Sequence, residues 1–101
     1  MSSTSDYARR LRNKSYVYEY LQEHPCITCG EADIRVLDFD HRDPSLKSFG
    51  IHRSITNRYS IAKIAEEIKK CDVLCSNCHR RKTAHENNWY SHQRILEEMG
   101  E

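Results

Sequence analysis

The sequence predicts a small α+β domain that is closed by a bound metal ion. Three observations predict it: a long stretch with helical spacing of apolar residues, two short segments with the alternation of strands, and two Cys-x-x-Cys pairs. The chain has 101 residues, of which 38% are apolar and 31% are charged. The hydrophobic core is therefore expected to be thin, and chains of this size often add a disulfide, a metal or a partner.

The first expected element is an amphipathic helix over residues 6–23. This stretch contains no Gly or Pro, and its apolar side chains recur at helical spacing. Pro25 ends the helix, because proline lacks an amide donor and disfavours helical geometry at the residue before it. The first half of the helix carries four basic residues, which form either a solvated face or an edge that contacts phosphates: Arg9, Arg10, Arg12 and Lys14.

The segment after the first cysteine pair has the alternation of a strand, from Ile34 to His41. Asp40 and His41 are expected at the end of this strand and on opposite faces of it. Residues 42–45 favour a turn. Residues 46–60 are expected to form a long loop, with a short strand near residues 49–52 as an option.

The second half of the chain is expected to contain two more helices and the second strand. Ser60 can cap a helix that continues to about residue 70. Residues 72–74 fit a short strand, and a helix follows the second cysteine pair. Helix is expected to continue beyond a bend near residues 87–88 and to dock on the domain through four apolar residues: Trp89, Ile95, Leu96 and Met99.

The two cysteine pairs supply four thiolates in the local spacing that tetrahedral zinc favours: Cys26, Cys29, Cys75 and Cys78. Residues 30–74 separate the pairs, far more than the roughly 15 to 20 residues of a zinc ribbon, so a substantial segment is inserted. An odd total of five cysteines fits metal ligands better than a disulfide framework. We expect a structural zinc, with a redox pair or disulfides as the alternatives. Cys71 is expected to be a buried apolar side chain rather than a substitute ligand or a redox sensor.

The formal net charge of +1 argues against a strongly cationic, histone-like binder. Any contact with nucleic acid must therefore come from local basic clusters. No stretch approaches the about 20 apolar residues of a membrane span, and the N-terminus lacks the apolar run of a secretory signal. We expect a soluble cytoplasmic protein with a single domain, divided into an N-terminal helix (1–24), a zinc-containing core (25–86) and a C-terminal helix (87–101).

The zinc ligands bring the end of the first strand near the start of the helix after the second pair. Asp40 and His79 could then hold an oxygen-preferring divalent ion, while His41 is free to deprotonate water. Hydrolysis of a phosphodiester needs both a Lewis acid and a general base.

Three motifs together resemble the HNH endonuclease family of the ββα-metal type. They are the first Cys-x-x-Cys pair, the sequence LDFDHRDP from Leu37 to Pro44, and the sequence LCSNCHRRKT from Leu74 to Thr83. The resemblance extends from about residue 26 to residue 83. It implies a zinc-stapled ββα-metal domain with additional flanking helices. It also implies a DNA endonuclease of the kind found in phage, mobile elements, and restriction and packaging systems.

The resemblance implies a role for each motif residue. Asp40 and His79 resemble the ligands of a catalytic metal, usually Mg²⁺ or Mn²⁺, and His41 resembles the general base. The expected substrate is DNA, cut to leave a 5′-phosphate and a 3′-hydroxyl. Phosphate contacts are expected from basic residues around the site, with a solvated helix face as the alternative: Arg42, Arg80 and Lys82. Targeting is expected to come from DNA structure or from a protein partner.

One position departs from the family pattern. The family's middle Asn, which orients the base histidine, lies about nine residues before the helix histidine, and this position is Lys70 here. Asp72, Asn77 or a backbone carbonyl are the candidates to replace it. The alternative function is a non-catalytic zinc module that binds nucleic acid or protein.

Overall fold

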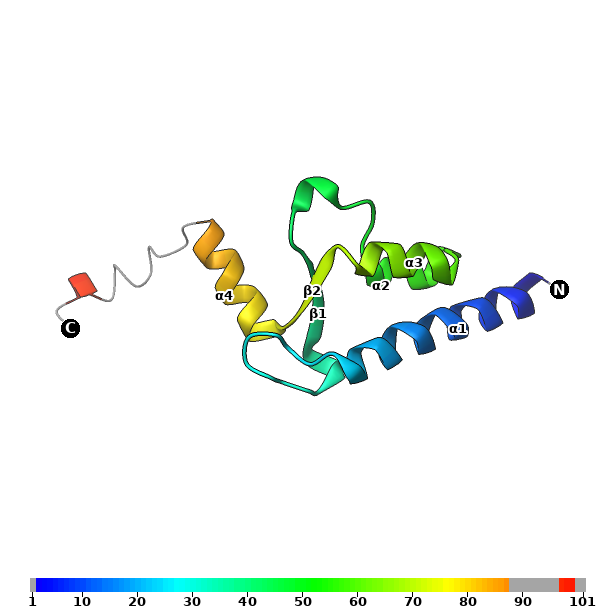
Figure 1. Cartoon of the computed structure of the whole chain (residues 1–101), viewed down its shortest axis with the longest axis horizontal. Helices are drawn as coiled ribbons and strands as arrows, with labels where there is room; N and C mark the ends of the chain where they lie inside the picture. The colour runs from blue at the N-terminus through cyan, green and yellow to red at the C-terminus, as the bar shows by residue number, and fades with distance from the viewer. Residues whose placement is uncertain (1, 88–96, 100–101) are drawn as a thin grey trace.

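In the computed structural model, the described part of the chain contains a long N-terminal helix, a two-stranded sheet and three shorter helices (Figure 1). The structure describes residues 2–87 and 97–99. It has the small α+β architecture that the sequence predicts. The elements follow in this order: α1 (Ser2–Glu23), the 3-10 turn η1 (Ile34–Val36), β1 (Leu37–His41), the 3-10 turn η2 (Pro44–Leu46), α2 (Ile51–Thr56), α3 (Ile61–Ile68), β2 (Cys71–Cys75) and α4 (Ser76–Glu86).

Helix α1 packs on the domain through one buried stripe near its C-terminal half. It ends two residues before Pro25, as predicted, and begins four residues earlier than expected. Val17 and Leu21 are one turn apart and are fully buried. Asn13 is also buried, and its Nδ2 donates to the carbonyl of Tyr59 at 2.9 Å. This bond ties the helix to the segment that precedes α3.

The two strands form an antiparallel hairpin whose register runs from Leu37 opposite Cys75 to His41 opposite Cys71. The prediction that the strand begins at Ile34 is wrong. Residues 34–36 form the turn η1, because Asp33 caps it by accepting from the amide of Arg35 at 3.0 Å. Strand β2 also ends at Cys75, so residues before Leu37 have no strand to pair with.

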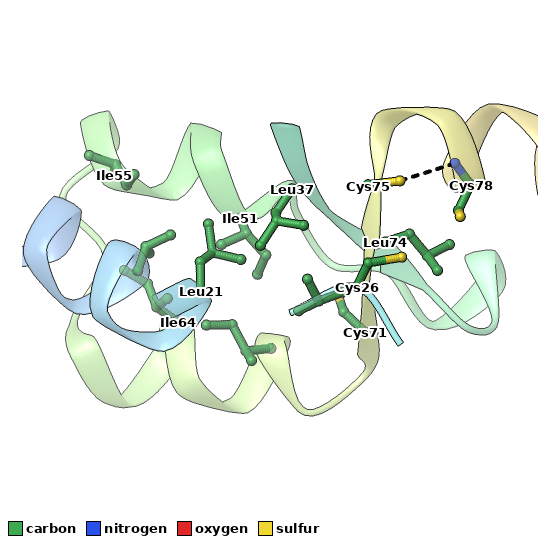
Figure 2. Close-up of a cluster of buried hydrophobic side chains, with 13 residues drawn as sticks. Leu21, Cys26, Leu37, Ile51, Ile55, Ile64, Cys71, Leu74, Cys75 and Cys78 are labelled. Carbon is green, nitrogen blue, oxygen red and sulfur yellow. Dashed lines mark hydrogen bonds between the residues drawn. The ribbon is translucent and has the colours of Figure 1, made fainter. Parts of the chain in front are cut away.

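The segment 46–60 is not the long loop that the sequence predicts. It contains helix α2, and residues 51 and 52 of the optional strand belong to this helix. Ile51 and Ile55 lie one turn apart and are both buried, and Figure 2 shows them in one cluster with Leu21 and Ile64. A helix of six residues is not stable alone, so packing against these neighbours determines its conformation.

Helix α3 and the elements after it agree with the prediction. Ser60 caps α3, since its side chain accepts from the amide of Lys63 at 3.1 Å. The helix ends at Ile68, slightly before the expected end. Strand β2 contains the predicted residues 72–74, and α4 begins directly after it, at Ser76.

The core is continuous from the helices to the hairpin (Figure 2). It begins among α1, α2 and α3 and includes three of the four paired cysteines, so the sulfur cluster lies at its edge. The docking predicted for Trp89, Ile95 and Leu96 lies outside the described residues, and the side chain of Met99 is 68% exposed. None of the described helices has the length and apolar character to cross a membrane.

Replacing Ile64 by Ala should lower the free energy of unfolding by about 2 to 5 kcal/mol, because the side chain is fully buried among the three helices. The measurement is urea unfolding followed by circular dichroism. Leu46→Ala is the control, since Leu46 is 60% exposed and its loss should cost less than about 0.5 kcal/mol. Equal losses in the two variants would contradict the assigned core.

Candidate functional site

The two cysteine turns bring four sulfur atoms together where β2 passes into α4. The Sγ atoms of the four paired cysteines all lie within 4.8 Å of one another, and those of Cys29 and Cys75 are 3.6 Å apart. A tetrahedral zinc ion with bonds of about 2.3 Å separates its sulfur ligands by about 3.8 Å. The cluster therefore fits a metal ion such as zinc.

Local backbone bonds shape the first turn and fix it to the hairpin. Gly30 has a φ of 81°, a left-handed conformation that favours glycine, and its amide donates to the carbonyl of Cys26 at 2.9 Å. The amide of Ile27 donates to the carbonyl of Val73 at 3.0 Å. The first turn is thereby held against β2, and its sulfurs face those of the second turn.

The second turn is also the first turn of α4. The Sγ atom of Cys75 caps the helix by accepting from the amide of Cys78 at 3.4 Å (Figure 2). Burial acts to raise the pKa of Cys26, but backbone amide donors outweigh it and lower the pKa to about 6. Burial and the neighbouring sulfurs raise the pKa of Cys78 to about 12. One thiolate therefore forms readily, whereas a cluster of several thiolates needs a cation to balance its charge.

Cys71 stands apart from the cluster, as expected. It is buried at the start of β2, and burial raises the pKa of its thiol to about 11. Its sulfur contacts the carbonyl of Glu67 at 3.6 Å. Cys71 has the environment of an inert apolar side chain.

Two carboxylates of β1 lie on either side of an imidazole of α4. Asp40 Oδ1 is 3.3 Å from Nε2 of His79, and Asp38 Oδ2 is 3.2 Å from Nδ1 of the same ring. Asp38 and Asp40 are two residues apart, so they share one face of the strand. The structure thus brings Asp40 and His79 together and adds Asp38, which the sequence analysis missed although it shares the strand face of Asp40.

An open pocket of about 460 Å³ lies beside this group. It is lined by Asp38 and His79 together with residues from the first two turns of α4: Ser76, Asn77, Arg80 and Thr83. Carboxylate, imidazole and guanidinium groups therefore converge on one concave surface. Such a surface suits a cation and an anionic ligand together.

The basic residues named as phosphate contacts have different surroundings. Arg80 lines the pocket. The ammonium of Lys82 contacts Asp40 Oδ2 and is 3.3 Å from Glu86, and the Asp40 carboxylate raises the pKa of Lys82. Lys82 therefore already balances part of the charge of Asp40.

Arg42 joins the ends of the two strands. Its Nη1 donates to the carbonyl of Cys71 and to Asp72 Oδ1, each at 2.9 Å, and its Nη2 donates to the carbonyl of Lys69. These acceptors, which lie at the start of β2 and just before it, already bind the guanidinium. A phosphate would have to compete with them.

His41 lies on the opposite face of β1 from Asp40, as the strand alternation predicts. It is 9% exposed, and its Nε2 is 2.7 Å from Oε2 of Glu67, which is 2% exposed. Its contact is thus with α3 and not with Asp40 or His79. Sequence analysis missed Glu67, although its place three residues after Ile64 on the buried face of α3 was a signal that could have identified it.

Glu67 is the centre of a buried polar network. Its Oε2 also accepts from the amides of Ser48 at 2.8 Å and Phe49 at 3.4 Å, and its Oε1 accepts from Lys70 Nζ at 2.9 Å. Burial acts to raise the pKa of Glu67, but these donors and His41 outweigh it and lower the pKa to about 2. The carboxylate is therefore ionised and joins β1, α3 and the segment after η2.

No protein-family model, curated protein or solved structure matches this chain. The interpretation of the site consequently rests on the motif residues and on the geometry described above.

Replacing Cys75 by Ser should abolish tight zinc binding and cooperative unfolding, because this buried side chain supplies one of four sulfurs and binding of a structural metal contributes directly to folding. Zinc content after dialysis and thermal unfolding are the measurements. Cys71→Ser is the matched control on the same strand, and it should keep its zinc. Loss of zinc in the control, or its retention in Cys75→Ser, would exclude this ligand set.

Glu67→Gln should lower stability by about 2 to 3 kcal/mol at pH 7, because the buried donors lose a charged acceptor. The native pKa of about 2 lies below the ordinary value of 4.5, so the stability from ionisation is complete above pH 4.5 and is lost as the pH falls toward 2. The difference in urea midpoint between wild type and Glu67→Gln should shrink over this range. A difference independent of pH would contradict an ionised Glu67.

Proposed function

We propose that this chain is a metal-dependent DNA endonuclease of the HNH type, with a ββα-metal core. The observation that carries the proposal is the approach of Asp40 on β1 to His79 on α4, with 3.3 Å between Oδ1 and Nε2 beside an open pocket. Two ligands at about 2.1 Å from an octahedral ion and at right angles to each other are about 3 Å apart. The pair fits Mg²⁺ or Mn²⁺, the ions that the resemblance implies.

The four cysteines hold a structural zinc in this proposal. A site closed by four thiolates has no open position for substrate, so this ion serves the fold and not the chemistry. Because Cys75 and Cys78 begin α4, the zinc fixes the helix against the first cysteine turn. It thereby holds His79 opposite Asp40.

A divalent cation at Asp40 and His79 would supply Lewis-acid stabilisation of the scissile phosphate. The residues around it prepare the ligands. Because a carboxylate can only accept, the hydrogen bond between His79 and Asp38 would keep a proton on Nδ1. A cation shared by Asp40 Oδ1 and Nε2 would then use the lone pair of Nε2. Lys82 contacts the other oxygen of Asp40 and can exchange this carboxylate for a DNA phosphate.

His41 is the proposed general base. It follows Asp40 directly at the end of β1, and its role is to take the proton of the attacking water. The proposed phosphate contacts are Arg80, which lines the pocket, and Lys82, which lies one turn of the helix from His79 and contacts Asp40. Contacts of this kind are independent of sequence, so targeting would come from DNA structure or a protein partner.

The second candidate function is a non-catalytic zinc module that binds nucleic acid or protein. The contact of Lys82 with Asp40 favours it, because an ammonium already balances the carboxylate. The hydrogen bond of His41 to Glu67 also favours a non-catalytic module, because it directs the imidazole away from Asp40 and His79. Such a module would bind DNA through the basic residues of α4 without cutting it.

Supercoiled plasmid incubated with zinc-loaded protein should be cut when Mg²⁺ or Mn²⁺ is added. His41→Ala should lose about 10² to 10⁴ in rate while keeping its zinc, because the general base is removed and the sulfur cluster is intact. Asp40→Ala and His79→Ala should lose metal-dependent cleavage. His52→Ala, an exposed histidine of α2, is the matched control and should cleave as wild type does.

The outcome separates the two candidate functions. DNA binding without cleavage by any divalent metal, unchanged in Asp40→Ala and His79→Ala, would support the non-catalytic module. Full activity of His41→Ala would show that His41 is not the general base. Relaxed circles as product would indicate nicking, and linear product would indicate double-strand cleavage.

Arg80→Ala should weaken duplex DNA binding and reduce the slope of log K against log salt by about 0.9, the loss of one phosphate contact. Fluorescence anisotropy with a labelled duplex in EDTA measures binding without cleavage. Lys47→Ala is the control, because this exposed lysine is the C-cap residue of η2 and does not line the pocket. An unchanged slope in Arg80→Ala would assign Arg80 to a solvated helix face.

A further inference from the structure

We propose that Glu67 is a positioning residue that holds the His41 ring with Nε2 protonated and Nδ1 open to take a proton. This inference rests on the proposed function, since it concerns the base of that reaction. In this chain the Glu67 carboxylate, on α3, would take the place of the family's middle Asn.

The first argument is the hydrogen bond itself. Nε2 of His41 is 2.7 Å from Oε2 of Glu67, and both side chains are buried. An ionised carboxylate offers only acceptors, so the ring must present an N–H at Nε2. In the neutral ring the lone pair is then at Nδ1, which is the atom a general base needs.

The second argument is that Nδ1 reaches the surface. Among the described residues, every fully buried side-chain nitrogen or oxygen has a hydrogen-bond partner. Within residues 2–87 and 97–99, the His41 side chain makes a hydrogen bond through Nε2 and none through Nδ1. Because no fully buried nitrogen there lacks a partner, Nδ1 is not fully buried. The ring is therefore held at one nitrogen and open at the other.

The third argument is that Glu67 is itself held in place. The amide of Ser48 donates to the same oxygen as His41, and Lys70 Nζ donates to the other oxygen. These bonds from two sides prevent rotation of the carboxylate, so it can fix the imidazole plane. Lys70, at the family's Asn position, therefore acts on the base through Glu67.

The two side chains that the sequence offered to replace the family's Asn make other contacts. Asp72 accepts from Arg42 at 2.9 Å, and Asn77 lines the pocket beside His79. The structure thus assigns the orienting acceptor to Glu67.

The first experiment determines the His41 tautomer by long-range ¹H–¹⁵N correlation on zinc-loaded protein at pH 8. Wild type should show a neutral ring protonated at Nε2. Glu67→Gln, which keeps an acceptor oxygen, should retain this tautomer, and Glu67→Ala should show a mixture of tautomers. Glu66→Ala is the matched control, because this neighbouring glutamate is exposed and pairs with Lys69 rather than with His41. A wild-type ring protonated at Nδ1, or at both nitrogens, would overturn the inference.

The second experiment is a double-mutant cycle on cleavage. Glu67→Ala should lower kcat about 10- to 100-fold with KM changed less than about threefold. In the His41→Ala background the same change should cost nothing further, because Glu67 acts only through His41. Equal losses in both backgrounds would show a structural role and overturn the inference. Zinc content and thermal unfolding are measured for each variant, and Glu67→Met, which has a similar length but no oxygen acceptor, serves in its place if Glu67→Ala does not fold.

The two proposals fail in different ways. If no divalent metal gives cleavage, the proposed function fails, whereas the tautomer still shows whether Glu67 orients the ring. If His41→Ala abolishes cleavage but the wild-type ring is protonated at Nδ1, the function stands and the role of Glu67 is excluded.

Discussion

The convergence of four cysteine sulfurs is the constraint on which the rest of the structure depends. It joins a turn that follows α1 to the first turn of α4, across the residues that form the hairpin and two helices. Cys75 both ends β2 and caps α4, so the direction of the helix relative to the sheet is fixed at this residue. With 38% apolar residues the core is thin, and a metal ion bound by the cysteine cluster would add to the stability of the fold.

The hairpin divides the polar chemistry between two environments. On one face of β1, Asp38 and Asp40 contact His79 beside an open pocket, which the proposed cation and DNA would enter. The other face carries His41 into a buried network centred on Glu67. Alternation along a strand thus separates the proposed metal ligands from the proposed base, although they are adjacent in sequence. In the proposed reaction, their cooperation at one phosphate would depend on Nδ1 of His41 at the end of the strand.

The parts of the fold with local signals were predicted, and the parts without them were not. The first helix, the Ser60 cap and the second strand follow from spacing, capping and turn chemistry. Helix α2 was missed because two isoleucines one turn apart carry too little periodicity to distinguish a helix from a loop. The prediction that the first strand begins at Ile34 was wrong, because the end of β2, and not the propensity of residues 34–36, limits the strand pairing.

The sequence by itself predicted the cluster of four cysteines and the approach of Asp40 to His79, because the cysteine spacing and the motif residues that carry the resemblance can be identified from their order along the chain. Only the tertiary structure decided the environments of these groups. Asp38 and Glu67 became part of the site, and Lys82 was placed against Asp40, through contacts between residues that are 26 to 42 positions apart. The packing of α3 and α4 on the hairpin decides which side chain contacts each imidazole nitrogen and each carboxylate oxygen of the site. No local pattern encodes that packing.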